Sequence, residues 1–476
     1  MKRLFCIVSH LFLLLACAGA ELHILCTSDL HGHFEKIPAL AAVMKNVSGR
    51  TLKIDTGDTL TGTLYSDLCG GEPMIRLLNH LRFDVWVPGN HDFETGYEAF
   101  SARAGEFKGV TLGTHWRWKD VVPVKWKLFE IDGIRAAVIG ATDPSMPRRI
   151  LPGADGDFGD VTESIGRIMP EILASRPHII ILAFHNGLYS KYARLYDLLR
   201  THPEIDLVFG GHSHKEIAGH KLRHVYFVQA GCHGSCVAHV TVRADLKSGR
   251  VTRIESELLY PDDRMRDAET EALCGEFIRK QREIASLPVA ETTMRCAWPK
   301  PRERHSELGV FYAASLMRAA KADAALVSLP TTRGTSADKP GRHTLTEEDL
   351  YRLFPFRNRV CTVVLTKDDL PELGAFLRDY EKKRKRRCFF AGDVTSGKNG
   401  VLRMKSDRCI LAVSDFMLVS TPVLRSKLDT PGAWKIVGGL LERDVLRDSF
   451  RRAAGQLPAS LPQKVQRGKQ AFGRQN

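Results

Sequence analysis

The sequence lacks the hallmarks of several large classes of protein. Its 11 cysteines in 476 residues are widely spaced and include no Cys-x-x-Cys pair, so neither a dense disulfide framework nor a thiolate zinc site is expected. No internal repeat and no nucleic-acid-binding motif is recognisable, and after the first 20 residues no segment is long and apolar enough to span a membrane. We therefore expect no repeat architecture, no duplex nucleic acid as partner and no transmembrane helix in the mature chain.

The composition is that of an ordinary globular protein. Hydrophobic residues make up 43% of the chain and charged residues 26%, and 476 residues suffice for two domains that each bury a sizeable core. The net charge of +14 is partly local, since residues 382–387 are six consecutive cations. That run is either a solvated helix end or a patch that attracts anionic lipids or polyanionic substrates.

The first 20 residues have the pattern of a secretory signal peptide. Lys2 and Arg3 precede an apolar stretch over residues 4–16, and Ala18-Gly19-Ala20 provides a small-x-small cleavage site. Cys17 follows aliphatic and small residues, a pattern that also resembles the site at which bacterial lipoproteins receive their lipid. We therefore expect a secreted or periplasmic protein, with a lipid anchor at Cys17 as the alternative to ordinary cleavage.

Nine cysteines, from Cys26 to Cys409, remain after this leader. Their odd number and wide spacing argue against a full set of disulfides. Cys232 with Cys236, or Cys388 with Cys409, could pair after export, and buried thiols are the other interpretation.

Short β-rich apolar runs alternate with helix-like stretches from residue 22 to about residue 242. This rhythm is typical of a layered α/β domain built on a largely buried sheet. A hairpin is expected around residues 247–250. The other expected strands are residues 22–27, 51–55, 85–87, 135–140, 179–184, 207–209 and 225–230.

A second α/β domain is expected after a helix and a proline-containing hinge. Apolar residues recur at helical spacing over residues 264–284, and Pro288, Pro299 and Pro301 follow. Beyond them, a helix is expected at residues 308–320 and strands at 324–328 and 360–365. The expected boundaries are 1–20 for the signal peptide, 21–262 for the first domain, 263–300 for the linker helix and hinge, 301–455 for the second domain and 456–476 for a basic disordered tail.

Potential metal ligands follow five of the expected strands. Asp29 and His31 follow the first strand, Asp58 the second, Asn90 and His91 the third, His185 the strand at 179–184, and His212 and His214 the strand at 207–209. Residues two apart in an extended chain face the same side, so Asp29 and His31 could bind one ion. Gly57 would let the backbone approach closely beside Asp58.

The coincidence of these residue types points to metal chemistry. Carboxylate, amide and imidazole groups are ligands that borderline divalent cations accept. Five loops supply enough of them for two ions, with Asp58 as the bridging ligand. The sequence contains no convincing Ser-His-Asp or Cys-His arrangement that would supply a protein nucleophile instead.

These motifs, in this order, resemble the signature of the calcineurin-like metallophosphoesterases. The matching stretches are Asp29-x-His31, Gly57-Asp58, Gly89-Asn90-His91-Asp92, His185 and Gly211-His212-x-His214. Ser28-Asp29-Leu30-His31-Gly32-His33, His91-Asp92-Phe93-Glu94 and Gln229-Ala230-Gly231 resemble the bacterial 5′-nucleotidase branch, closely over residues 21–290 and more weakly over 300–430. The resemblance implies a four-layer α/β/β/α metallophosphoesterase domain followed by a smaller α/β substrate-binding domain.

The resemblance also assigns the ligands of two divalent metal ions, which would be Mn, Zn, Co or Fe. Asp29, His31, Asp58 and His214 would hold one ion, and Asp58, Asn90, His185 and His212 the other. His91 would stabilise the phosphoryl oxygens or protonate the departing alcohol. The family usually has Asp three residues later to orient this histidine, and here the position is Glu94, one methylene longer.

The implied reaction is hydrolysis of a small phosphate ester, most of all of a nucleoside 5′-monophosphate to nucleoside and phosphate. Two cations would lower the pKa of a bridging water, and the hydroxide would attack phosphorus in line while His91 assists the leaving group.

Four residues of the second domain stand where the family binds the nucleotide, namely Arg333, Phe356, Asn358 and Phe416. The two rings would sandwich the base, and core packing is their alternative interpretation. The family's glycines before the arginine are replaced by Pro330-Thr331-Thr332, and its Gly-Gly-Asp-Gly-Tyr after the second ring by Ser420-Thr421-Pro422-Val423-Leu424.

Other functions therefore stay open. The same chemistry would serve a 2′,3′-cyclic nucleotide phosphodiesterase, a nucleotide-sugar hydrolase or a thiosulfohydrolase-like esterase. A different class is a non-catalytic surface binding protein whose basic run captures polyanions. The intact ligand set argues against this last class, because a degenerate site would be free to lose Asp58 or His214.

Overall fold

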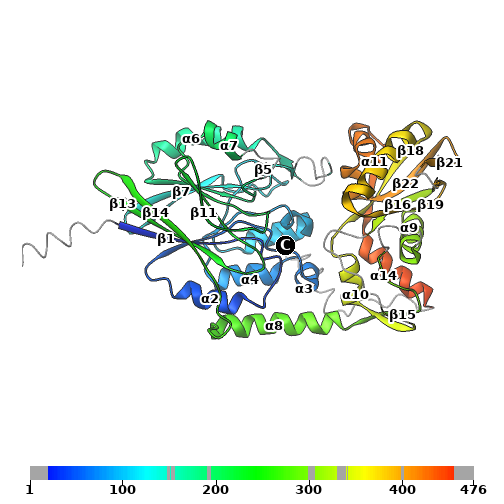
Figure 1. Cartoon of the computed structure of the whole chain (residues 1–476), viewed down its shortest axis with the longest axis horizontal. Helices are drawn as coiled ribbons and strands as arrows, with labels where there is room; N and C mark the ends of the chain where they lie inside the picture. The colour runs from blue at the N-terminus through cyan, green and yellow to red at the C-terminus, as the bar shows by residue number, and fades with distance from the viewer. Residues whose placement is uncertain are drawn as a thin grey trace, which may run out of the picture. The chain divides into compact units, whose positions relative to one another are not determined.

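The computed structural model describes residues 20–146, 151, 156–189, 195–298, 306–329, 339, 341–397 and 401–454. The signal peptide, Cys17, the basic tail and Arg333 lie outside these residues. The described residues form two compact units, which appear in Figure 1. The first unit comprises the residues up to Thr61, Gly71–Met146 and Asp157–Gly275, and the second comprises Gly62–Gly70, Leu151, Gly156 and the residues from Glu276 onward.

The first unit contains two six-stranded sheets. In one sheet the order is β14-β13-β1-β2-β3-β4, with β1 to β4 parallel to one another and β13 antiparallel to both β1 and β14. The bounds are β1 Ala20–Thr27, β2 Thr51–Asp55, β3 Val85–Trp86, β4 Val110–Thr111, β13 Val237–Asp245 and β14 Arg250–Leu259. The hairpin predicted around residues 247–250 joins β13 to β14.

The other sheet has the order β11-β12-β10-β9-β7-β6. Its four central strands are parallel, and β11 and β6 pair antiparallel at the two edges. The bounds are β6 Trp126–Ile131, β7 Ile134–Ala141, β9 Ile179–Phe184, β10 Leu207–Phe209, β11 Glu216–Leu222 and β12 Val225–Ala230. Trp116–Arg117 (β5) and Asp157–Phe158 (β8) form a separate short pair.

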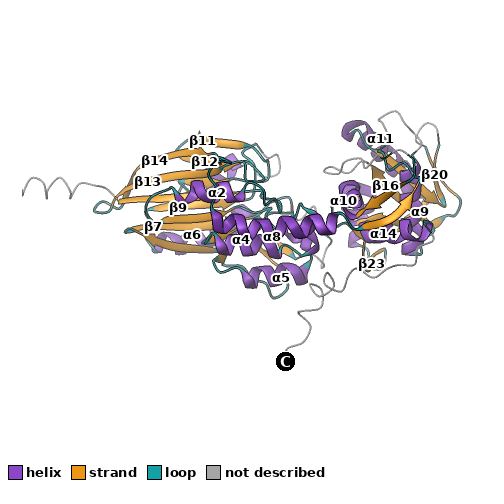
Figure 2. Ribbon diagram, turned by 90° about the horizontal axis from the view of Figure 1, so that it is seen from below, coloured by secondary structure: helices purple, strands orange, loops and turns teal. Residues whose placement is uncertain are grey.

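The two sheets pack face to face around one apolar core. Ile24 and Val87 of the first sheet share this core with Val138 and Ile181 of the second. Helices α6 (Val161–Ala174) and α7 (Leu195–Thr201) bury their apolar side chains against the outer face of the second sheet. Figure 1 shows α2 (Ile37–Lys45) and α4 (Glu72–His80) on the opposite side, and α5 (Tyr97–Glu106) is seen with them in Figure 2. The four-layer α/β/β/α fold is confirmed.

The strand rhythm by itself predicted one largely buried sheet, whereas the unit has two. In β1, Ile24 faces the partner sheet, and its neighbour Leu25 is also fully buried. Strands of both sheets are thus covered on both faces and read as continuous apolar runs. The sequence pattern therefore cannot assign a strand to one sheet or the other.

The second unit is built on a five-stranded sheet of order β19-β16-β22-β18-β23. Its strands are β16 Ala324–Leu329, β18 Arg359–Thr366, β19 Arg387–Gly392, β22 Arg408–Ser414 and β23 Trp434–Leu441. Alternate residues of β16 enter opposite cores, Ala325 and Val327 on one face, Ala324 and Leu326 on the other. This alternation is the strand period of two, and it makes the sheet the middle layer of an α/β unit.

Helices cover both faces of this sheet. One face carries α9 (Glu307–Ala320), α10 (Glu347–Leu353) and α14 (Glu442–Ala453). The other carries α11 (Leu370–Arg384), α12 (Asp415–Ser420) and α13 (Pro422–Arg425). The remaining elements are α3 Leu64–Leu68, α8 Ala268–Ala285, β15 Pro288–Thr292 paired with β17 His343–Thr346, and β20 Val394–Ser396 paired with β21 Leu402–Met404.

The basic run at residues 382–387 is only partly a solvated helix end. Residues 382–385 are exposed at the end of α11, but Arg386 is buried and donates a hydrogen bond to the hydroxyl of Tyr380 at 2.7 Å. Arg387 forms an ion pair with Glu381 at 3.0 Å. The exposed charge is thus smaller than the sequence indicates.

The nine cysteines of the described residues form no disulfide, so neither Cys232 with Cys236 nor Cys388 with Cys409 is paired in this structure. None of the described helices combines the length and the apolar character that crossing a membrane requires.

Candidate metal centre

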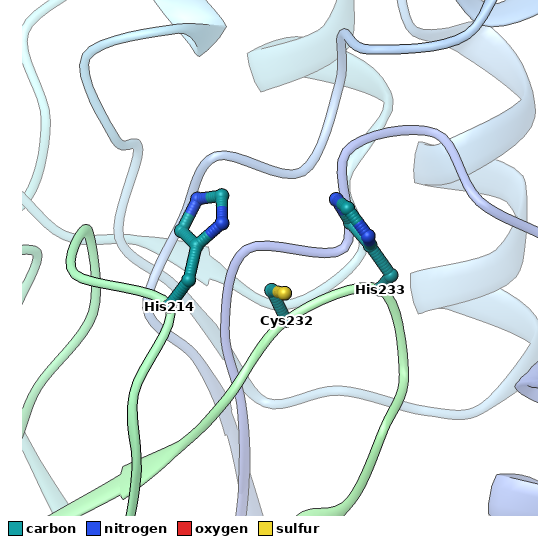
Figure 3. A group of neighbouring side chains, drawn as sticks. All are labelled: His214, Cys232 and His233. Atoms are coloured by element: carbon teal, nitrogen blue, oxygen red, sulfur yellow. The ribbon is translucent and has the colours of Figure 1, made fainter. Parts of the chain in front are cut away.

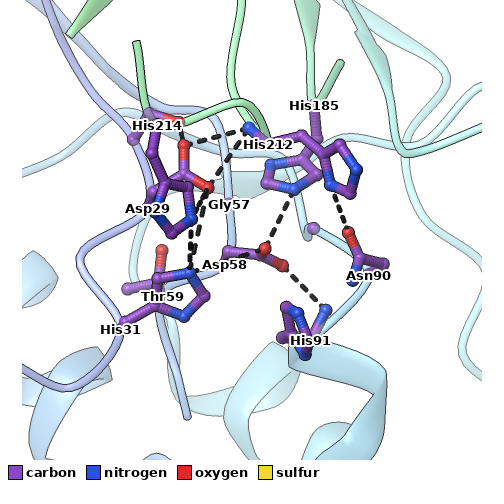
Figure 4. Close-up of polar contacts among 12 residues, drawn as sticks. Asp29, His31, Gly57, Asp58, Thr59, Asn90, His91, His185, His212 and His214 are labelled. Carbon is purple, nitrogen blue, oxygen red and sulfur yellow. Dashed lines mark hydrogen bonds and ion pairs between the residues drawn. The ribbon is translucent and has the colours of Figure 1, made fainter. Parts of the chain in front are cut away.

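The seven predicted metal ligands come together at one edge of the first unit, as Figure 4 shows. They lie in loops that follow β1, β2 and β3 of one sheet and β9 and β10 of the other. Each of these strands is parallel to its neighbours among the five, so the loops after their carboxyl ends gather at the same edge. Strand order and direction, rather than nearness in sequence, therefore assemble the centre.

Backbone hydrogen bonds join the first two of these loops. The N–H of Asp29 donates to the carbonyl of Gly57 at 2.8 Å, and that of His31 donates to the carbonyl of Asp58 at 2.9 Å. The backbone there is also strained, because five of the seven predicted ligands have a positive φ. These are Asp29 (53°), His31 (49°), Asp58 (53°), His212 (67°) and His214 (57°). Such conformations are uncommon outside glycine and concentrate at functional sites.

Two glycines allow the loops after β2 and β3 to approach each other. A Cβ on Gly57, whose φ is 91°, would lie 2.2 Å from the backbone nitrogen of Gly89. A Cβ on Gly89 would lie 2.4 Å from the backbone nitrogen of Asp58. Any side chain at either position would push these loops apart, so the close approach predicted for Gly57 is confirmed.

The first group of candidate ligands consists of Asp29, His31 and His214. Nε2 of His214 lies 3.4 Å from Oδ1 of Asp29 and 3.2 Å from Nε2 of His31. Nδ1 of His31 donates to the carbonyl of Thr61 at 3.0 Å, which leaves Nε2 as the nitrogen that can bind a metal.

The second group consists of Asp58, His185 and His212. Nε2 of His185 lies 3.1 Å from Oδ2 of Asp58, and its Nδ1 donates to the carbonyl of Thr56 at 2.6 Å. Nδ1 of His212 lies 2.8 Å from Oδ1 of Asn90, which adds the predicted amide to this group. Asp58 lies between the two groups, since its Oδ2 is also 3.7 Å from Nε2 of His31.

These residues fit divalent cations by their chemistry and their burial. Nε2 of His185 is buried 3.1 Å from Oδ2 of Asp58, and its other nitrogen is already committed as a donor, so Nε2 is the nitrogen that can bind a metal beside that carboxylate. Burial lowers the pKa of His185, but the neighbouring Asp58 outweighs that effect and raises it to about 10. Asp29 and Asp58 are buried in the same centre, so bound cations would have two carboxylates beside them to neutralise.

His91 and Glu94 are also arranged as the sequence predicted. Nδ1 of His91 donates to Oε1 of Glu94 at 2.7 Å, so the longer carboxylate does reach the ring. The backbone N–H of His91 donates to Oδ1 of Asp58 at 2.7 Å. Glu94 thus fixes the ring, and the catalytic role of the histidine remains a prediction.

The sequence assigned no role to Asp92, whose carboxylate holds two of the ligand-bearing loops together. Its carboxylate is fully buried and accepts four backbone hydrogen bonds of 2.7–2.9 Å, from Asp58, Thr59, Leu60 and Gly89. It therefore ties the loop after β2 to the loop after β3. Its place inside the Asn-His-Asp motif was the available signal.

Asp143 was also missed. It follows β7, is buried, and places Oδ2 3.9 Å from Nε2 of His212, the ring nitrogen that faces away from Asn90. Both carboxylate oxygens accept hydrogen bonds of 2.8 Å from Ser145. A carboxylate beside the second nitrogen of a metal-binding histidine fixes the ring's orientation. The signal was a polar turn, Thr142 to Ser145, directly after a predicted strand.

The second unit places three of the four predicted nucleotide-binding residues, and Arg333 lies outside the described residues. Phe416 is 42% exposed at the start of α12, so it is not a core residue, and Phe356 is half-buried. Asn358 donates from Nδ2 to the buried carboxylate of Glu442 at 2.8 Å, a contact that the sequence did not predict.

Comparisons with known proteins agree with this architecture. The family model described as calcineurin-like phosphoesterase matches residues 22–216, and that described as 5′-nucleotidase, C-terminal domain, matches residues 284–379. The 5′-nucleotidase of Vibrio cholerae is 25% identical over 72% of this chain and 73% of its own length. Endonuclease YhcR of Bacillus subtilis is 23% identical over 72% of this chain, but the chain spans only 30% of that protein.

A solved structure shows the same fold. The 5′-nucleotidase precursor from Thermus thermophilus superposes with a TM-score of 0.64 at 18% identity and covers 93% of this chain and 98% of its own. Two consecutive family matches follow the order that the motifs predicted, the first mostly within the first unit and the second within the second unit. The chain therefore belongs to the calcineurin-like metallophosphoesterases, a family of metal-dependent phosphoester hydrolases, in the branch that carries a 5′-nucleotidase C-terminal domain.

Proposed function

We propose that this chain hydrolyses small phosphate esters, with nucleoside 5′-monophosphates as the main substrates, using two divalent metal ions. One observation carries the proposal: two groups of ligands lie side by side, and the carboxylate of Asp58 borders both. Asp29, His31 and His214 would hold one ion with Asp58, and Asn90, His185 and His212 would hold the other with it.

Bound cations would neutralise the charge of a phosphate ester and make hydroxide available near neutral pH. The protein's own contribution is to keep the ligands in place. His31 and His185 each commit Nδ1 to a backbone carbonyl, so Nε2 of each ring stays directed at the centre. Asp92 holds the backbone from Asp58 to Leu60, and that of Gly89, through four hydrogen bonds. The ligand positions are thus set before substrate binds.

His91 is the group proposed to act on the substrate. Because Glu94 accepts a hydrogen bond from Nδ1, the ring is oriented. Nε2 is then the nitrogen left to contact a phosphoryl oxygen or the departing alcohol. In its protonated form the ring can donate to a departing alkoxide. His91 would therefore act as general acid, with Glu94 as its positioning residue.

The nucleotide part of the proposal is supported by how the second unit pairs its strands. Val360 of β18 pairs with Ser414 of β22, and Arg359 forms an ion pair of 2.8 Å with Asp415. Asn358 directly precedes Arg359, and Phe416 directly follows Asp415 at the start of α12, so this ion pair joins the two segments that carry these side chains. An exposed ring beside an amide is a suitable surface for stacking and hydrogen-bonding a base.

One assay panel tests the function. Purified protein is freed of metal, supplied with Mn, Co, Zn or no metal, and tested for hydrolysis of AMP, cyclic AMP, UDP-glucose and p-nitrophenyl phosphate. We expect metal-dependent phosphate release, fastest from AMP. Preference for cyclic AMP or UDP-glucose would overturn the assignment to nucleoside 5′-monophosphates but not the chemistry. Hydrolysis of none of the four by metal-loaded protein would overturn the enzymatic function and favour a binding protein.

We also propose export, on the basis of the leader-like residues 1–20. Mass spectrometry of the native protein tests it: a chain that begins near residue 21 indicates ordinary cleavage, and a lipid mass on Cys17 indicates an anchored lipoprotein. An intact residue 1 in the native protein would overturn the proposal.

A further inference from the structure

A second set of metal-binding side chains lies beside the first ligand group, and the proposed reaction does not use two of its three members. Cys232, His233 and His214 each offer one donor atom, and all three atoms lie within 4.8 Å of one another, as Figure 3 shows. Cys232 is a half-buried thiol and His233 is exposed. These three residues are called the thiol group below.

The loop that carries Cys232 and His233 is attached to the backbone of the metal centre. The N–H of His233 donates to the carbonyl of Asp29 at 2.9 Å. His233 and Gly234 both have a positive φ, 54° and 69°, so the chain turns sharply at this point. The ring of His33 lies against that of His233, with 4.0 Å between the ring centroids. The thiol group is therefore held in place rather than displayed on a loose loop.

The donor set of the thiol group differs from that of the catalytic groups. It combines one thiol with two imidazoles, whereas the described ligands of the catalytic groups are carboxylates, an amide and imidazoles. Thiolate prefers Zn²⁺, Cu⁺ and similarly soft ions over Mn²⁺ or Mg²⁺. Around a tetrahedral zinc ion the donors lie about 3.5 Å apart, given metal–ligand bonds of about 2.0–2.3 Å. The donor atoms of the thiol group therefore need to move only about 1 Å closer to one another. Rotation of these partly exposed side chains provides that movement.

His214 belongs both to the thiol group and to the first catalytic group. Its Nε2 is 3.4 Å from Oδ1 of Asp29 and 3.2 Å from Nε2 of His31. A neutral imidazole has one lone pair for a metal, because its other nitrogen carries a proton. A soft ion bound by Cys232 and His233 would therefore compete for His214 with the first catalytic ion.

We propose that Cys232, His233 and His214 form an inhibitory site for thiophilic metal ions, which lowers hydrolysis by withdrawing His214 from the first catalytic ion. The binding part of this inference stands by itself, and the inhibitory part rests on the proposed role of His214 as a catalytic ligand.

Cadmium is the probe for binding, because its bond to thiolate absorbs in the ultraviolet. The full chain is stripped of metal, reloaded with Mn²⁺ and titrated with Cd²⁺ while the charge-transfer absorbance is recorded. We expect a band that saturates in wild-type protein, is lost in Cys232→Ser and is weakened in His233→Gln, which keeps the thiol. Cys388→Ser is the matched control, since Cys388 is another half-buried thiol in the second unit, and its band should equal that of wild type. A full band in Cys232→Ser would overturn the site.

Hydrolysis of p-nitrophenyl phosphate measures the inhibition, with each variant compared with its own rate before Cd²⁺ is added. Loss of an outer-shell partner weakens metal binding by roughly 10- to 100-fold, so loss of the thiol should raise the inhibitory Cd²⁺ concentration by at least that factor. Equal inhibition of wild type and Cys232→Ser, or cadmium binding to the thiol without inhibition, would overturn the competition for His214. Absence of hydrolysis with every metal would instead refute the proposed function, and the absorbance band would still decide whether the site binds metal.

Discussion

Replacing Asp92 by asparagine should destabilise the first unit far more than the loss of one buried charge suggests. One oxygen of Asp92 accepts the N–H groups of Thr59 and Leu60 at 2.9 and 2.7 Å. The other accepts those of Asp58 and Gly89 at 2.9 and 2.8 Å. Asparagine has only one acceptor oxygen, so whichever way its amide turns, two backbone donors lose their acceptor and face an NH₂ group instead.

The size of the effect follows from the number of hydrogen bonds lost. A hydrogen bond to a charged group contributes about 1.5–3 kcal/mol, so two of them correspond to about 3–6 kcal/mol of unfolding free energy. A domain of about 200 residues loses about 2–4 °C of Tm per kcal/mol, so Asp92→Asn should lower the Tm by roughly 10 °C or more.

Intrinsic fluorescence during thermal unfolding measures this change, because four of the six tryptophans, at positions 86, 116, 118 and 126, lie in the first unit. Asp84→Asn is the matched control. Asp84 uses a single oxygen to accept the N–H of Lys53 at 2.8 Å, and asparagine can replace it, so the loss should stay below about 1 kcal/mol. If the two variants unfold at the same temperature, the four hydrogen bonds of Asp92 do not hold the loops as described.

Four further changes test other parts of the structure. Asp58→Asn should lower kcat for phosphate release by at least roughly 100-fold, since both ligand groups share this carboxylate, and retained turnover would contradict the shared role. Glu94→Gln should lower kcat by roughly 10-fold with little change in KM, because the ring of His91 loses its anionic partner, whereas a change in KM alone would indicate a binding role. Burial raises the pKa of Glu442 from 4.5 to about 7, and a carboxyl whose folded-state pKa is raised stabilises the protein below its unfolded-state pKa and loses that effect as pH rises. The unfolding free energy of the second unit should therefore fall by about 3 kcal/mol as the pH rises from 4.5 to 7. Urea denaturation across that pH range measures this fall, and Glu442→Gln should abolish it. Phe416→Ala should raise the KM for AMP several-fold and leave p-nitrophenyl phosphate unaffected, with the equally exposed Ile410→Ala as control, and equal effects on both substrates would argue against stacking.

The metal centre could be predicted because its ligands are recorded locally in the sequence. Asp29 and His31 stand two residues apart directly after an apolar strand and belong to one ligand group, whereas His212 and His214, also two apart after a strand, belong to different groups. Parallel strands then bring such loops to one edge whatever their separation in the chain. The α/β class followed from the same apolar runs, whereas the four-layer arrangement was implied only by the family resemblance.

What the sequence could not predict depends on contacts between distant segments. The four donors to Asp92 come from backbone N–H groups, which every residue type except proline carries, so no side-chain pattern announces them. The bond from Asn358 to Glu442 joins residues 84 apart, and both residue types are common on surfaces. The sequence also does not show which strands belong to which sheet, since central strands such as β9, β10 and β12 are buried on both faces.

Because the ligand loops extend from two different sheets, the packing of the core between the sheets affects the geometry of the metal centre. The loop bearing Asp58 extends from one sheet and the loop bearing His185 from the other, and Thr56 spans the gap by donating to the carbonyl of Gly210 at 3.0 Å. The spacing of the sheets is fixed by side chains such as Ile54 and Phe209, well below the chemistry. Packing between the sheets therefore helps to set the separation of the two ligand groups, although none of these core side chains belongs to either group.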